Sequence, residues 1–156
     1  MANKLYKKLK WKLWLLGRFK IPMLGSLRPK LLFIDDEVVY LKIKLKRRSK
    51  NHLNSMYFGA LAVGADCAAG LHAFYYAEKH QQKISFAFKS MHGQFLKRVE
   101  TDAIFTFKGG KEIENVVLQS MKSGERYNHS CQIEVFNKQE ELVALFTMEA
   151  SVKALL

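Results

Sequence analysis

The residue whose type and surroundings best suit chemistry is Asp66, which interrupts a stretch of small apolar residues, GALAVGADCAAG, at positions 59–70. A carboxylate is costly to bury unless it has hydrogen-bond partners or a chemical task. In a helix, Asp66 lies seven residues beyond Gly59, about two turns, and so near the face that carries the first turn. Two interpretations are open: a structural carboxylate held by hydrogen bonds, or a general base or nucleophile.

Cys67 and the histidines are weaker chemical candidates. Adjacent helical residues point about 100° apart, and no histidine is placed to orient Cys67, so a small buried thiol is expected there. Four histidines show no metal-ligand spacing and are expected at the surface or in the core: His72, His80, His92 and His129. We therefore expect no metal site. The segment KGGK at 108–111 lacks the features of a phosphate-binding loop and predicts a turn.

Hydrophobic periodicity predicts the elements that must position Asp66. Asn54 or Ser55 can cap a long helix that runs to about Lys79, and its many Ala and Gly residues predict that a sheet encloses it closely. Strands are predicted at Val38–Lys46, Ile84–Ser90, Arg98–Phe107, Tyr127–Phe136 and Leu142–Lys153, and a short helix at Glu112–Lys122. The short connections favour antiparallel pairing. The sequence therefore predicts an α+β fold with a curved antiparallel sheet wrapped around a long central helix.

Composition limits the class of protein. The chain has 156 residues, of which 49% are hydrophobic and 26% charged, and this suits one folded domain and excludes wholesale disorder. No apolar run free of charges approaches the ~20 residues that cross a bilayer. Two cysteines without a CxxC pair favour a reducing, cytoplasmic setting, and no redox cofactor is indicated.

The net charge of +12 is concentrated near the N-terminus. Residues 1–50 hold 15 Lys or Arg against 3 acids, whereas residues 51–156 hold 11 of each. A nucleic-acid-binding domain normally spreads basic side chains over its folded face. Nucleic acid is therefore not the expected partner.

Residues 1–30 predict a basic amphipathic helix and a linker, ahead of a main domain at residues 31–156. The helix is indicated by a leucine stripe at Leu5, Leu9, Leu13 and Leu16, with lysines on a neighbouring face and Trp11 and Trp14 turned away. Glycines and prolines from Gly17 to Pro29 predict a linker or wrapping loop. Two interpretations are open for the helix: it lies on an anionic membrane surface through residues 1–20, peripheral at the inner membrane, or it docks on its own domain or on a partner protomer.

The segment NHLNSMYFGALAVGAD, at positions 51–66, resembles the hotdog-fold acyl-CoA thioesterases, particularly those of the phenylacetyl-CoA thioesterase type. That family's segment reads N-x-x-G-x-x-H-G-G-A-L and ends in an Asp. The matching positions are Asn51, Gly59, Ala60, Leu61 and Asp66. Tyr57 replaces the family's His, Phe58 its first Gly and Asn54 its turn Gly. The Tyr-Phe-Gly triplet looks closest to an uncharacterised hotdog branch, and the resemblance covers roughly Phe33 to Ala154.

The resemblance implies a hotdog fold and a role for each matched residue. The backbone amide of Phe58, beside Gly59, would polarise the thioester carbonyl at the start of the helix, where free amides and the helix dipole favour developing negative charge. Asn51 would position the carbonyl or a water molecule, and Asp66 would be the general base or nucleophile. Tyr57 can donate a hydrogen bond to the carbonyl but cannot readily shuttle protons at neutral pH. In the family the carboxylate and the amides come from different protomers, which implies a homodimer or a dimer of dimers.

Substrate contacts are expected on either side of the matched segment. Ser85 or Gln82, at the start of the next strand, would orient water or Asp66. Coenzyme A is anionic, so basic side chains are expected at the mouth of the site. The candidates are Lys46, Arg47, Arg48, Lys50, Lys89, Lys97 and Arg98. Each of them can equally be a solvated surface group. An apolar pocket would draw on Met56, Phe74, Phe86, Phe88 or Phe105.

These observations give three hypotheses. The first is a thioesterase that hydrolyses an acyl-CoA or acyl-carrier-protein thioester with Asp66, with coenzyme A present only as part of the substrate and no other cofactor. The second is a non-catalytic acyl-thioester or lipid binding module, in which Tyr57 and Phe58 mark lost turnover. The third is a lipid-surface interaction protein recruited by its basic N-terminal helix.

Overall fold

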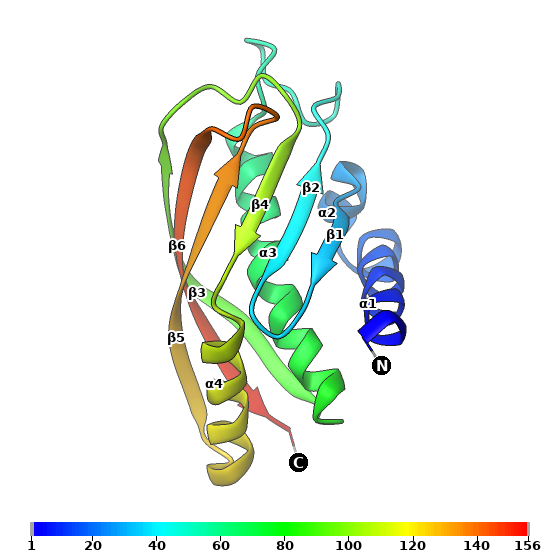
Figure 1. Cartoon of the computed structure of the whole chain (residues 1–156), viewed down its shortest axis with the longest axis vertical. Helices are drawn as coiled ribbons and strands as arrows, with labels where there is room; N and C mark the ends of the chain where they lie inside the picture. The colour runs from blue at the N-terminus through cyan, green and yellow to red at the C-terminus, as the bar shows by residue number, and fades with distance from the viewer. Residues whose placement is uncertain (1, 156) are drawn as a thin grey trace.

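A six-stranded antiparallel sheet curves around one long helix in the structure, a computed structural model that describes residues 2–155 (Figure 1). The strands are β1 (Lys30–Ile34), β2 (Val39–Ile43), β3 (Ile84–Phe95), β4 (Ala103–Phe107), β5 (Arg126–Phe136) and β6 (Leu142–Ala154). They lie in the order β1-β2-β4-β5-β6-β3, and each neighbouring pair is antiparallel. The predicted α+β class, with a hotdog arrangement of sheet and helix, is confirmed.

The central helix α3 (Phe58–Lys79) is enclosed because small residues let the sheet approach its backbone. Most of its side chains are buried. At Gly64 the fully buried ring of Phe105, on β4, occupies the space of a side chain: a Cβ built on Gly64 would lie 2.2 Å from Phe105 Cζ. The prediction of close cover is therefore confirmed, and Phe105 belongs to the core.

The helix α3 begins at Phe58, later than the predicted caps. Asn51 and Ser55 bind each other instead: Asn51 Nδ2 donates to Ser55 Oγ at 3.0 Å, and Asn51 Oδ1 accepts from the amides of Leu53 and Ser55 at 2.9 and 3.2 Å. These contacts hold residues 51–55 in a turn. The prediction that Asn54 or Ser55 caps the helix is wrong, because the side chain of Ser55 is committed to Asn51.

The sequence predicts most strands but misses β1. β1 is short, and its register shifts between Leu31 and Phe33, so it lacks the regular alternation of β2. β4 begins later than predicted because Arg98–Asp102 forms a loop. Asp102 anchors this loop by accepting a hydrogen bond from the Leu45 amide at 2.9 Å and by pairing with Lys42 at 3.1 Å.

The N-terminal segment is helical well beyond the predicted helix. α1 (Ala2–Leu15) leads into the π-helical η1 (Leu16–Lys20) and then α2 (Pro22–Leu27), where a loop was predicted. The backbones of η1 and α2 touch: a Cβ on Gly25 would lie 2.0 Å from the Gly17 carbonyl oxygen. Two glycines therefore permit a helical corner in place of a linker.

The helix α1 docks on its own domain. Leu9 and Leu13 are buried, and the ammonium groups of Lys8 and Lys12 both pair with Glu78 on α3. Partial burial alone would raise the pKa of Glu78, but the two lysines outweigh it and lower that pKa. The helix α1 is therefore packed on its own domain, and none of the described helices is long and apolar enough to cross a bilayer.

Candidate active site

The Asp66 side chain lines a shallow hollow of about 420 Å³ between α3, the edge strand β3 and its neighbour β6. Ala62 and Val63 line it from the helix, and Met148 lines it from β6. Residues 88–91 of β3 complete the wall, and there the strand carries a bulge between Phe88 and Ser90. A bulge redirects side chains locally, and it places Lys89 at the hollow that holds Asp66.

Burial raises the pKa of Asp66 above its ordinary value. The side chain itself is exposed at the surface of one protomer, although protein atoms crowd around it. The direction of the pKa change follows from that crowding, and a partner that covered the hollow would remove more water and raise the pKa further. A carboxylate in this setting is a stronger base than one in free solution.

Two backbone amides are free at the start of α3. The amides of Ala60 and Leu61 donate to the Tyr57 carbonyl at 2.9 and 3.2 Å, whereas those of Phe58 and Gly59 have no hydrogen-bond partner within residues 2–155. Free amides at a helix N-terminus stabilise negative charge. The start of α3 therefore has the properties of an oxyanion-binding site.

Tyr57 and Phe58 shape the approach to these amides. Their rings lie 4.6 Å apart and are half exposed. A Cβ on Gly59 would lie 2.6 Å from Tyr57 Cε1, so the tyrosine ring folds back over the glycine. Gly59 leaves room for the Tyr57 ring in this position, and both aromatic rings border the candidate oxyanion site.

Within one protomer, Asp66 and the free amides are too far apart to act on the same carbonyl group. Asp66 follows Phe58 by eight positions in α3, which is roughly 12 Å along a helix axis. Catalytic groups must come within about 3 Å of the atoms they act on. The two halves of the candidate site can work together only if a second chain supplies one of them.

An exposed strand edge lies next to both halves of the candidate site, Asp66 and the free amides. The outer edge of β3 has no strand partner among residues 2–155, because β3 ends the sheet. Met91 and Phe95 on this strand are 43% and 53% exposed, and the Phe95 ring lies 6.4 Å from that of Phe58. Unpaired edges with exposed apolar side chains pair readily with another chain.

Several predicted site residues are committed to local structure. Asn51 forms the turn before α3, so its side-chain oxygen is fully engaged there. Gln82 donates to the carbonyl oxygens of Lys83 and Leu155, at 2.9 and 2.6 Å. Ser85 Oγ accepts from Arg126 at 3.2 Å. Neither Gln82 nor Ser85 lines the hollow at Asp66.

The predicted basic and apolar contacts lie in different places. Lys89 and Phe88 line the Asp66 hollow, but Arg48 lines a second hollow beside the N-terminal helices. Arg47 and Lys50 are exposed in the loop between β2 and α3. Met56 is buried in the core and is not among the residues that line the Asp66 hollow.

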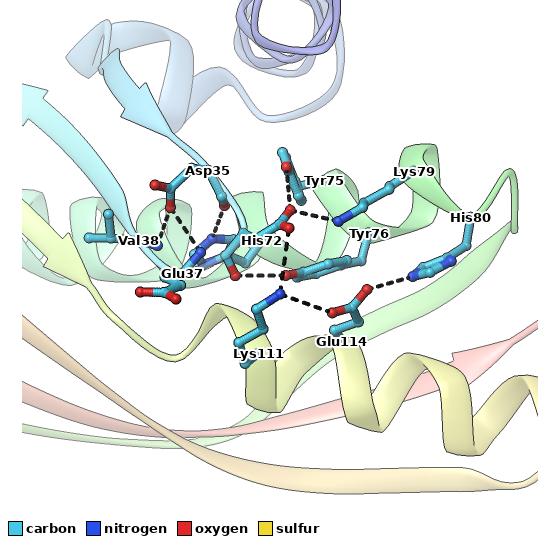
Figure 2. Close-up of polar contacts among 11 residues, drawn as sticks. Asp35, Glu37, Val38, His72, Tyr75, Tyr76, Lys79, His80, Lys111 and Glu114 are labelled. Atoms are coloured by element: carbon cyan, nitrogen blue, oxygen red, sulfur yellow. Dashed lines mark hydrogen bonds and ion pairs between the residues drawn. The ribbon is translucent and has the colours of Figure 1, made fainter. Parts of the chain in front are cut away.

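A polar network that sequence reasoning missed fixes the second half of α3 (Figure 2). Asp36, in the turn between β1 and β2, accepts from Lys79 and Tyr75, each at 2.7 Å, and Lys111 lies 3.5 Å away. The Lys79 ammonium is the main reason that the pKa of Asp36 falls to about 2. The only sequence signal was the acidic run at 35–37, which says nothing about its partners.

His72 is the buried centre of this network. Its Nε2 lies 2.9 Å from the Asp35 carbonyl oxygen, so Nε2 carries the proton and donates, whereas Nδ1 has no partner among the described residues. Burial lowers the pKa of His72 and keeps the ring neutral. His72 therefore lies in the core, one of the two environments expected for it from the sequence.

The other candidate groups are not arranged for catalysis. Cys67 is buried, and burial together with the neighbouring Asp66 raises the pKa of its thiol far above the usual range. Burial raises the pKa of Cys131 to about 12. Within residues 2–155 no three His, Cys, Asp or Glu side chains converge to hold a metal ion.

Comparisons with known proteins agree with this architecture. Residues 10–152 match the family described as a domain of unknown function, DUF4442. Comparison with curated proteins gives no match. Several solved structures share the fold at low sequence identity, which supports a common architecture without fixing a shared activity.

Three of these structures illustrate the range of structural similarity. A protein of unknown function from Chlorobaculum tepidum has a TM-score of 0.83 at 12% identity, with 97% of this chain and 96% of that chain covered. A protein of unknown function from Pseudomonas aeruginosa, described as a probable thioesterase, has a TM-score of 0.76 at 17% identity, covering 96% and 95%. A thioesterase from Haemophilus influenzae has a TM-score of 0.68 at 11% identity, covering 95% and 92%.

The resemblance seen in the sequence is therefore confirmed at the level of fold, and the chain belongs to the DUF4442 family.

Proposed function

We propose that this protein is a homodimeric thioester hydrolase that acts on an acyl-CoA or acyl-carrier-protein substrate. One observation carries the proposal: the Asp66 side chain lines a surface hollow beside an unpaired edge strand, while two free amides lie about 12 Å away on the same helix. A twofold axis at β3 would bring the carboxylate of one protomer to the amides of the other. The thioesterase descriptions of two fold relatives support the same reaction class.

In the proposed mechanism, ionised Asp66 removes a proton from a water molecule, and the water oxygen attacks the thioester carbonyl carbon. The carbonyl oxygen becomes an oxyanion, which accepts hydrogen bonds from the Phe58 and Gly59 amides of the other protomer. The intermediate collapses to a carboxylic acid, and the C–S bond breaks to release a thiolate, which takes the proton held by Asp66. Attack by Asp66 itself, through an anhydride that water then hydrolyses, is the alternative course.

Charge at the hollow suits the proposed substrate. Lys89 lines the same hollow as Asp66 and would attract an anionic coenzyme A or phosphopantetheine substrate through its charge. Phe88, Met91 and Met148 give the hollow an apolar wall for the acyl group. Coenzyme A enters this scheme only as part of the substrate, and the reaction needs no other cofactor.

The activity test compares the wild type with Asp66→Asn on acyl-CoAs of several chain lengths. Removing a general base lowers kcat by about 10²–10⁴-fold, and we expect a loss in that range. Cys67→Ala is the matched control, because Cys67 is adjacent in sequence but buried, and it should retain activity. Equal turnover by the wild type and Asp66→Asn would refute the assignment of Asp66.

The dimer is tested separately with Phe95→Asp, which places a charge on the exposed β3 edge. We expect this variant to run as a monomer in size-exclusion chromatography with light scattering and to lose activity. Phe33→Asp is the control, because Phe33 is also half exposed but lies on β1, at the opposite edge of the sheet. A monomeric wild type with full activity would contradict the shared site.

A non-catalytic acyl-thioester binding module is a second candidate. The half-exposed rings of Tyr57 and Phe58 border the free amides, and they can restrict the approach of a carbonyl group. Tight binding of a non-hydrolysable acyl-CoA analogue, with no turnover by either the wild type or Asp66→Asn, would favour this candidate. Turnover that is lost in Asp66→Asn favours the enzyme.

A further inference from the structure

Most basic side chains of the N-terminal segment have no acidic partner in the described part of the chain. Residues 1–34 contain nine Lys or Arg and no Asp or Glu. Lys8 and Lys12 are engaged by Glu78. The other seven form no ion pair with any described residue: Lys4, Lys7, Lys10, Arg18, Lys20, Arg28 and Lys30.

Several of these cations surround a hollow of about 1030 Å³ formed by α1, η1, α2 and β1. Its floor includes the buried side chains of Leu13, Leu24 and Leu31. The basic side chains that line it are Lys10, Arg18, Arg28, Lys30 and Arg48, and no acidic residue lines it. The hollow thus combines an apolar floor with a lining whose charged residues are all cationic.

An exposed aromatic cluster borders the same hollow. Trp11, Trp14 and Phe19 are 59%, 52% and 65% exposed. The rings of Trp11 and Trp14 stack at 4.9 Å, and Phe19 meets Trp14 edge-on at 6.1 Å. Arg18 lies over the Phe19 ring at 5.3 Å, so a cation and the aromatic cluster are presented together. Tryptophan with Lys and Arg is typical of surfaces that lie at the boundary between lipid headgroups and acyl chains.

The hollow and the candidate active site lie at opposite edges of the sheet. The hollow is beside β1, whereas Asp66 opens beside β3, and these two strands end the sheet on its two sides. Figure 1 shows α1 and α2 beside β1, with β3 and β6 on the far side of α3. A ligand in the hollow would therefore leave both Asp66 and the β3 edge free.

We propose that this hollow seats an anionic membrane phospholipid and so holds the protein on a bilayer surface. The basic wall binds the headgroup phosphate, the leucine floor accepts part of an acyl chain, and Trp11, Trp14 and Phe19 enter the interface around it. Charge complementarity selects an anionic lipid, and the apolar floor with its exposed aromatic cluster selects a lipid over a soluble phosphate. This inference is independent of the hydrolase proposal.

The test uses vesicles of pure phosphatidylcholine and vesicles with 30 mol% phosphatidylglycerol, with the full chain. We expect flotation with the anionic vesicles and little with the neutral ones. The chain has two tryptophans, and both lie in the aromatic cluster, so their emission should shift to the blue only with anionic vesicles. Failure of the wild type to bind anionic vesicles would overturn the proposal, whatever the outcome of the hydrolase assays.

Two matched triple variants distinguish binding at the hollow from attraction by the net charge of the protein. Each basic residue near an anionic surface strengthens binding about fivefold, so Arg18→Gln/Arg28→Gln/Lys30→Gln should weaken vesicle binding about 100-fold. The control, Lys83→Gln/Lys122→Gln/Lys138→Gln, removes the same charge from exposed lysines that form no ion pair among the described residues. An equal loss in both triple variants contradicts the proposal.

A soluble short-chain phosphatidylglycerol, used below its micelle concentration, distinguishes binding of a bilayer lipid from binding of a free lipid. Binding of this lipid together with the anionic vesicles, both reduced in the hollow variant, supports a bilayer lipid. Binding of the soluble lipid without any vesicle binding contradicts membrane docking. Thermal melts that match the wild type show that each variant is folded.

Discussion

Asp36→Asn should measure how strongly the turn between β1 and β2 is tied to α3. The substitution keeps an acceptor for the Tyr75 hydroxyl but removes the charge that faces Lys79 and Lys111. The pKa of Asp36 falls from 3.8 to about 2, mainly because of the Lys79 ammonium. At 1.36 kcal/mol per pKa unit this corresponds to about 2.4 kcal/mol. Because the Asp36 side chain is 38% exposed, solvent screening reduces the expected effect to about 1 kcal/mol.

The effect should depend on pH in a defined direction. A carboxylate with a lowered pKa in the folded state stabilises the protein above its unfolded pKa and loses this contribution as the pH falls toward the folded value. The difference in unfolding free energy between the wild type and Asp36→Asn should therefore be full at pH 7, about half at pH 3 and nearly gone at pH 2.

The assay is urea unfolding from pH 7 to pH 2, followed by circular dichroism. Glu37→Gln is the control, because Glu37 is the next residue, is exposed and forms no ion pair among residues 2–155. It should change the unfolding free energy by less than about 0.5 kcal/mol. A difference for Asp36→Asn that stays constant across this pH range would refute the ion-pair explanation.

Three further predictions concern the central helix. Gly64→Ala should destabilise the fold by about 1–3 kcal/mol in urea unfolding, because the new methyl group would meet the buried ring of Phe105; an unchanged midpoint would show that the ring can move away. Asp66→Asn should be more stable than the wild type at pH 7, since burial raises the pKa of Asp66 and the ionised form opposes folding. That advantage should shrink as the pH falls through the folded pKa of Asp66, and a gap that widens on acidification would be inconsistent with burial as the cause. Glu78→Gln should speed amide hydrogen exchange in α1 without changing exchange in β5. An exchange rate in α1 equal to that of the wild type would mean that the leucine contacts alone hold α1 on the domain.

The sequence by itself determined the class of fold and placed Asp66 on the enclosed helix. Alternating residues marked β2, and apolar β-rich runs between turn signals marked the long strands. The small residues around Asp66 indicated an enclosed helix. These signals succeeded because they are local. For His72 the sequence left the surface and the core open, and the structure places it in the core.

Only the tertiary structure decided which groups share a surface. Glu78 binds lysines some 70 positions away, Asp36 binds across to α3, and Arg48 lines the hollow beside α1 instead of the one at Asp66. Such pairings depend on how distant elements cross, and no local pattern encodes the crossing. The start of α3 was also a tertiary outcome, because the contact between Asn51 and Ser55 competes with helix capping and prevails once the turn is held in place.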